Sequence, residues 1–140
     1  MAENKTRLRI VTPERNLYDE DVDMVIMRAT SGDIGFMYGH APLTTTISYG
    51  MMRIIVDGGK ELHATVFGGF AEVMPDHITI LSDAAEWPDE IDPNRAREAK
   101  ERAEERIRNH ESNVDAKRAE LALRRALVRL DVSNTGGKRS

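Results

Sequence analysis

Residues 86–96 of this chain have the sequence Glu86-Trp87-Pro88-Asp89-Glu90-Ile91-Asp92-Pro93-Asn94-Arg95-Ala96, and the chain changes character across them. Before this stretch, apolar and polar residues alternate between glycines, which is typical of β-strands, whereas after it small apolar residues recur every three or four positions, which is typical of helices. Asp92 can cap a helix because its carboxylate can accept from the N–H groups of the first turn. Pro93 suits the first helical position, where its missing N–H costs nothing. The stretch therefore predicts a junction between two modules, residues 1–87 and residues 88–140.

Length and charge limit the class of protein. A chain of 140 residues accommodates one domain, or one small domain with an appendage. The formal net charge of -4 argues against a general nucleic-acid binder. The absence of cysteine favours an intracellular location. No apolar run approaches the roughly 20 residues that span a bilayer, and the first residues lack the apolar core of a signal peptide. We therefore expect any membrane association to run through a protein partner.

The first module has the pattern of short strands. Two hairpins are expected: one around Asp57-Gly58-Gly59-Lys60, because Asp-Gly tolerates positive φ, and one around Pro75-Asp76. The turn residues 30–33 and two following glycines favour ten residues without regular structure. Strands at this spacing with no helix between them predict an antiparallel sandwich or barrel of about 85 residues. The expected strands are Leu8–Val11, Val22–Met27, Met51–Val56, Glu61–Phe67, Phe70–Met74 and His77–Leu81.

The second module has the pattern of two helices joined by a short polar connection, so they should pack antiparallel. The second helix should begin near Ser112, and residues 133–140 should fray. Both apolar stripes are rich in alanine and bury little, so we expect the hairpin to be marginal unless the β domain, a ligand or a partner holds it. The predicted fold class is thus α+β, an N-terminal antiparallel β-sandwich followed by a C-terminal two-helix antiparallel hairpin. The stripes are Ala96, Ala99, Ala103 and Ile107, then Ala116, Ala119, Leu123, Ala126, Leu127 and Leu130.

Several segments, in this order and spacing, resemble the epsilon subunit of the bacterial F-type ATP synthase. The resemblance covers nearly the whole chain and departs from the family at Met37-Tyr38, where a leucine and a proline are usual. The segments are Thr12-Pro13-Glu14, Gly32-Asp33-Ile34-Gly35-Phe36-Met37-Tyr38-Gly39-His40-Ala41-Pro42, Gly68-Gly69-Phe70-Ala71-Glu72-Val73, Ile78-Thr79-Ile80-Leu81-Ser82-Asp83-Ala84-Ala85-Glu86 and Ile91-Asp92-Pro93-Asn94-Arg95-Ala96.

The resemblance implies a non-catalytic rotor-stalk subunit of a proton-translocating ATP synthase, peripheral at the cytoplasmic face of the bacterial cell membrane. It implies a β domain that grips the gamma subunit and the membrane-embedded c-ring. It further implies a hairpin that either folds onto the sandwich or extends into the alpha/beta catalytic head and inhibits ATP hydrolysis. No cofactor is required, but in some members ATP binds the folded hairpin as a regulatory ligand. The motif for that site is matched by Ile91, Asp92, Arg95 and Ala96.

The spacing of the arginines is compatible with such an ATP site. A hairpin that turns near Ser112 places Arg95 opposite Arg129, and guanidinium groups suit phosphate because they donate two hydrogen bonds at once. Carboxylates beside them can accept from an adenine amino group. The alternative is a solvated helix face with pairs such as Glu98–Arg102 and Glu104–Arg108. The candidate ATP-binding residues are Glu86, Ile91, Asp92, Arg95, Arg102, Arg125 and Arg129.

Two further surfaces are candidates for protein contacts. The segment 31–40 is rich in glycine and is expected to expose Phe36, Met37 and Tyr38. The alternative is that it forms a packed connection. The resemblance makes the basic residues of the second helix candidates for the inhibitory contact. The partner-contact residues are Ser31, Gly32, Asp33, Phe36, Met37, Tyr38 and His40, and the inhibitory residues are Arg118, Arg124 and Arg125.

Other function classes find less support in the sequence. A β-barrel nucleic-acid-binding protein with a basic helical extension would need aromatic residues spaced along a strand face beside Lys or Arg. Only 5% of residues are aromatic, and the β half is acidic. The histidines never come at metal-ligand spacing, and no catalytic constellation can be assembled, so neither a metal site nor an enzyme is predicted.

Overall fold

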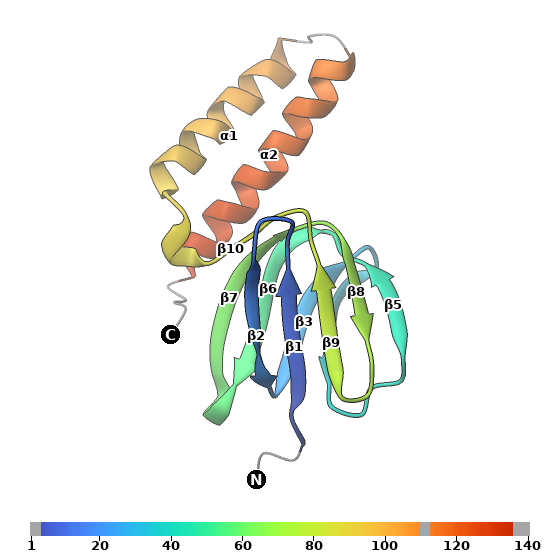
Figure 1. Cartoon of the computed structure of the whole chain (residues 1–140). Helices are drawn as coiled ribbons and strands as arrows, with labels where there is room; N and C mark the ends of the chain where they lie inside the picture. The colour runs from blue at the N-terminus through green and yellow to red at the C-terminus, as the bar shows by residue number, and fades with distance from the viewer. Residues whose placement is uncertain (1–3, 110–112, 136–140) are drawn as a thin grey trace.

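The computed structural model describes residues 4–109 and 113–135, and Figure 1 shows a β-sandwich with a helical hairpin projecting from one end. One sheet has the strand order β2-β1-β9-β8-β5 and the other has the order β10-β7-β6-β3-β4. The first sheet contains β1 (Thr6–Val11), β2 (Asn16–Val22), β5 (Leu43–Thr46), β8 (Phe70–Val73) and β9 (His77–Leu81). The second contains β3 (Met24–Ala29), β4 (Gly32–Met37), β6 (Tyr49–Val56), β7 (Lys60–Phe67) and β10 (Ala85–Glu86).

Both predicted hairpins are confirmed. Strands β6 and β7 pair antiparallel around the turn η2 (Asp57–Gly59), in which Gly58 has a φ of 75°. Met52 lies opposite Ala64, and Ile54 lies opposite Leu62, so apolar side chains from both strands point into the core. Strands β8 and β9 form the second hairpin. Between the hairpins the chain crosses sheets at Gly69, where an added Cβ would collide with the Leu81 carbonyl oxygen, so only glycine fits.

The structure corrects three expectations about the strands. Residues 22–27 are not one strand, because the chain changes sheets at Asp23, whose N–H donates to the Ile55 carbonyl at 2.8 Å. The region after residue 31 is not irregular, because β4 pairs with β3 along its whole length and places Gly35 opposite Ile26. The sandwich is not purely antiparallel either, since β1 runs parallel to β9. These strands are far apart in sequence, so no hairpin fixes their relative direction.

The core lies between the two sheets. Leu8, Ile10, Ile54 and Ile78 are fully buried, and complete burial of such a side chain contributes about 1.5–3 kcal/mol. Trp87, which follows β10 directly, is only 1% exposed. Its ring meets that of Tyr18 edge-on, with centroids 5.7 Å apart. The end of the sandwich domain is thereby anchored in the core before the helices begin.

The two helices are α1 (Pro93–Arg108) and α2 (Asn113–Asn134), which lie side by side and run in opposite directions (Figure 1). The predicted cap is confirmed: Asp92 Oδ1 accepts from the N–H groups of Asn94 at 2.9 Å and Arg95 at 3.3 Å. The predicted fold class is confirmed as well. The predicted start near Ser112 lies outside the described residues, as do residues 136–140 of the tail.

The alanine seam between the helices is confirmed at its centre. Its fully buried members are Ala96 and Ala103 of α1 and Ala119 and Ala126 of α2. Leu127 was wrongly assigned to the seam, because 45% of its surface is exposed. Towards its end α2 packs on β6 and β7, and it continues through Ser133 and Asn134, two residues that we had expected to fray. The end of α2, and not the seam alone, therefore joins the hairpin to the sandwich.

Candidate functional site

A pocket of about 360 Å³ lies where the linker η3 (Pro88–Glu90) meets both helices. This volume is at the lower end of the roughly 300–1,000 Å³ that is typical of ligand sites. Both helices contribute arginines, and the linker contributes carboxylates. The lining residues are Glu86, Glu90, Ile91, Asp92, Arg95, Ala96, Ala99, Arg102 and Arg129. Six of the seven residues predicted from the sequence are thus brought together.

Glu86 and Arg129 already contact each other across this pocket. Arg129 donates from Nε and Nη2 to the two carboxylate oxygens of Glu86, at 2.8 and 3.1 Å. Its guanidinium also lies 4.9 Å from the centroid of the Phe67 ring, within the range of a cation–π contact. One side chain of α2 is therefore bound both to the end of β10 and to β7, and it closes one wall of the pocket.

Arg95 and Arg102 lie on α1 and are exposed. Within the described residues, no ion pair joins Arg102 to Glu98 or Arg108 to Glu104, so the pairs that would explain a merely solvated face are not formed. Arg95 and Arg102 thus line the pocket, and within the described part of the chain neither forms an ion pair.

Arg125, the seventh predicted residue, does not line the pocket. Its guanidinium lies 5.8 Å from the centroid of the Tyr49 ring on β6, and that of Arg124 lies 4.9 Å from the same centroid. Two of the three arginines predicted for the inhibitory contact are therefore held against the sandwich. All three, Arg118 included, are nevertheless exposed on α2.

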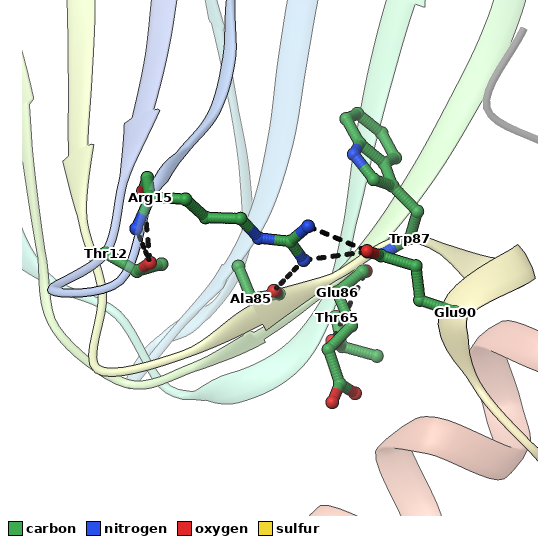
Figure 2. A network of polar contacts seen from close by, with 7 residues as sticks. All are labelled: Thr12, Arg15, Thr65, Ala85, Glu86, Trp87 and Glu90. Atoms are coloured by element: carbon green, nitrogen blue, oxygen red, sulfur yellow. Dashed lines mark hydrogen bonds and ion pairs between the residues drawn. The ribbon is translucent and has the colours of Figure 1, made fainter.

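Glu90 and the residue that holds it, Arg15, were not predicted from the sequence. Figure 2 shows the Arg15 side chain extending from the turn between β1 and β2 to the linker. It donates to both carboxylate oxygens of Glu90, at 2.7 and 2.8 Å, and to the Ala85 carbonyl at 3.3 Å. Glu90 also accepts from the N–H of Trp87 at 2.9 Å. The hydrogen bonds that Arg15 donates to Glu90 raise the pKa of Arg15. No local pattern joins two residues so far apart in sequence.

The predicted partner-contact segment proves to be half strand and half turn. Phe36 was expected to be exposed, but it is fully buried, because in β4 it lies opposite Val25 and faces the core. The alternation of a strand turns the next residue outward, and Met37 and Tyr38 are 50% and 48% exposed. Ser31, Gly32 and Asp33 are exposed too, and the ring of His40 lies edge-on to Phe36.

Comparison with protein families assigns both modules. Residues 5–88 match the model of the β-sandwich domain of the ATP synthase delta/epsilon chain, and residues 89–134 match the model of its long α-helix domain. The chain belongs to the ATP synthase epsilon-chain family. It is 49% identical to the ATP synthase epsilon chain of Bacillus velezensis, over 91% of this chain and 96% of the relative. It is also 46% identical to that of Caldanaerobacter subterraneus, over 91% and 92%.

Solved structures agree with this fold. A chain in the Euglena gracilis mitochondrial ATP synthase assembly of OSCP, F1 and c-ring matches with a TM-score of 0.83 at 22% identity, over 94% of this chain and 82% of that chain. A chain of the Tetrahymena thermophila central stalk and c-ring matches with a TM-score of 0.57 at 10% identity, over 92% and 96%. The family assignment confirms the predicted resemblance and the prediction of a non-catalytic subunit. Among the described residues, no helix has the length and apolarity that crossing a bilayer requires.

Proposed function

We propose that this chain is a rotor-stalk subunit of a proton-translocating F-type ATP synthase. Residues 1–87 would bind the gamma subunit and the membrane-embedded c-ring, and residues 88–140 would regulate ATP hydrolysis. The support is the match of both modules to one family, together with structural neighbours whose titles name F1, c-ring and central-stalk assemblies. Such a subunit sits peripherally at the cytoplasmic face of the bacterial cell membrane and reaches the membrane through its partners.

The surface proposed for contact with the stalk partners includes the end of β4 and the turn after it. Met37 and Tyr38 place two large, half-exposed apolar side chains there, and exposed apolar side chains are what a protein partner can cover. Asp33 forms an ion pair with Arg28 at 2.5 Å, so the start of the strand is held in place. The complete proposed set is Ser31, Gly32, Asp33, Met37, Tyr38 and His40, with Phe36 supporting it from the core.

The hairpin is proposed to inhibit hydrolysis when it extends into the alpha/beta catalytic head. Arg124 and Arg125 lie against Tyr49 in the folded form, so they are withheld from any acidic surface of the head until the hairpin opens. Extension would take these two arginines off the Tyr49 ring and carry them, with Arg118, towards the head. Alanine at these three positions should weaken inhibition in part, because acidic partner loops would lose their counter-charges.

ATP is proposed to hold the hairpin folded. The observation that carries this proposal is one pocket that combines arginines from both helices with carboxylates of the linker. A ligand that binds only the folded form stabilises it by RT ln(1 + [L]/Kd), about 2.7 kcal/mol at a hundredfold excess over Kd. Arg95, Arg102 and Arg129 would contact the phosphates, and Glu86 and Asp92 the adenine end. Arg125 lies one helical turn before Arg129 on α2. It would contact the phosphates only after leaving Tyr49.

Titration calorimetry on the isolated chain tests this site. Wild type should bind ATP, with ADP weaker because it carries less charge, and ATP should raise the melting temperature of the helical part. Arg95→Ala should remove most of that gain. Arg108→Ala is the matched control, because Arg108 is an exposed arginine of the same helix that does not line the pocket. Absence of binding at millimolar ATP, or equal losses from both substitutions, would contradict the proposal.

A further inference from the structure

The side chains that line the pocket carry as many negative as positive charges, which is unexpected for a site that takes a polyanion. Its lining includes three carboxylates, of Glu86, Glu90 and Asp92. Against them stand three guanidinium groups, of Arg95, Arg102 and Arg129. A triphosphate entering this site meets as many negative as positive side chains, and like charges brought together oppose binding.

A fourth positive charge next to the pocket, that of Arg15, comes from the sandwich. Arg15 bonds both oxygens of Glu90 in the two-pronged geometry that is favoured between guanidinium and carboxylate. Its turn is held by Thr12, whose N–H donates to the Arg15 carbonyl at 2.9 Å and whose hydroxyl accepts from the Arg15 N–H at 3.2 Å. A guanidinium stays charged at any physiological pH. Arg15 thus neutralises one of the three carboxylates without itself lining the pocket.

We infer that Arg15 is a positioning residue of the nucleotide pocket, which neutralises Glu90 and thereby gives the site a net positive charge. The inference rests on the ATP site proposed above and deepens it by adding a residue from the β domain. Because Glu90 also accepts from the N–H of Trp87, Arg15 keeps the carboxylate turned towards the linker backbone. The state of the β domain is thereby coupled to the affinity of the hairpin for its ligand.

Charge distinguishes this role from simple support of the linker. If Arg15 acts by neutralising Glu90, its loss should weaken ATP binding more than ADP binding, since the exposed carboxylate repels the more highly charged ligand more strongly. Removing the charge of Glu90 as well should then restore binding, because glutamine can still accept from Trp87. A linker that had merely come loose would weaken both nucleotides alike and would not be restored.

The experiment measures ATP and ADP binding to the full-length chain by calorimetry at fixed salt, since such effects are screened. Arg15 and Glu90 are 41% and 31% exposed, so solvent reduces the effect, and we expect Arg15→Ala to bind ATP about fivefold more weakly. Arg15→Lys, and the double substitution Arg15→Ala with Glu90→Gln, should bind within about twofold of wild type. Arg9→Ala is the matched control, because Arg9 is an exposed β1 arginine 4.0 Å from Asp19.

The outcomes separate the two proposals. If wild type does not bind ATP, the proposed ATP site itself fails. If wild type binds and Arg15→Ala binds equally well, only the role of Arg15 is overturned. If Arg15→Ala weakens binding and the double substitution does not restore it, Arg15 acts on the fold and the inference is again overturned. The fluorescence of Trp87, the single tryptophan and only 1% exposed, should keep the emission of a buried indole in each variant that supports the inference.

Discussion

Tyr49 should decide how firmly the end of α2 is held on the sandwich. It begins β6 and presents its ring to the guanidinium groups of Arg124 and Arg125, 4.9 and 5.8 Å from the ring centroid. Tyr49→Leu removes the π-system and leaves a shorter apolar side chain, whereas Tyr49→Phe keeps the π-system. Tyr49→Leu also removes the edge-on contact of this ring with Phe67, whose centroid lies 5.8 Å away. The pair of variants therefore measures the contribution of the ring to docking.

The expected effect follows from the two distances. A cation–π contact at an exposed site contributes about 0.5–1 kcal/mol and requires a separation within about 6 Å. The Arg124 contact is well inside that limit and the Arg125 contact is close to it, so together they should contribute about 1 kcal/mol. Arg129 over Phe67 stays in place, and the hairpin should remain mostly folded. A loss of this size corresponds to about a fivefold shift of the equilibrium towards the undocked hairpin.

Amide hydrogen exchange on the isolated subunit measures this shift directly. Tyr49→Leu should lower the protection of α2 about fivefold, while β1 and β9 keep theirs and Tyr49→Phe stays close to wild type. Tyr38→Leu is the control, because Tyr38 is an exposed tyrosine at the end of β4 that contacts neither arginine. Equal loss of protection in Tyr49→Leu and Tyr49→Phe, or no loss in either, would refute the assignment of docking energy to the ring.

A protein ending at residue 88 should melt cooperatively with β-type circular dichroism, because both sheets and Trp87 are complete in it, and an unfolded spectrum would contradict this. Deletion from Asp92 onward should raise the rate of ATP hydrolysis in a complex whose hydrolysis is inhibited. An unchanged rate would show that another part of the complex is the inhibitor. Arg53 and then His63 hydrogen-bond Glu61 and lower its carboxyl pKa below 4.5, so its stabilisation is present above pH 4.5 and is lost as the pH falls through the lowered value. The difference in melting temperature between wild type and Glu61→Gln should accordingly shrink as the pH drops below 4.5.

The parts of the fold that were predictable are those set by neighbours in sequence. The Asp-Gly turn fixed the β6–β7 hairpin, and the side-chain alternation fixed its inward face, as Ile54 opposite Leu62 shows. Asp92 and Pro93 fixed the start of α1. The parallel pairing of β1 with β9 has no local signal, because it depends on how two distant hairpins stack. Strand β4 was missed because its two glycines have the composition of a loop, yet its partner β3 holds it extended.

The same distinction separates the two layers of the candidate site. Arg95 and Arg129 could be paired from the sequence because an antiparallel hairpin brings residues equidistant from its turn together. That symmetry does not give side-chain direction, so it could not show that Arg125 turns to Tyr49 instead of the pocket. Nor could it show Arg15, which reaches the linker from the other module. Geometry within the hairpin was predictable, and geometry between the modules was not.

The folded hairpin is held by contacts that the proposed nucleotide ligand would exchange at small cost. The Glu86–Arg129 pair has side chains 27% and 32% exposed, and a partly exposed pair of this kind contributes about 1 kcal/mol. Arg95 and Arg102 face the same pocket, and within the described residues neither forms an ion pair. A triphosphate that displaced Glu86 from Arg129 would give up one weak pair and bring all three guanidinium groups onto one anion. The contact of Arg124 with Tyr49 lies outside the pocket, so this part of the docking would persist during the exchange. On the proposed function, the hairpin would therefore fold first and bind the nucleotide second, with the ligand adding to a closed state that already exists.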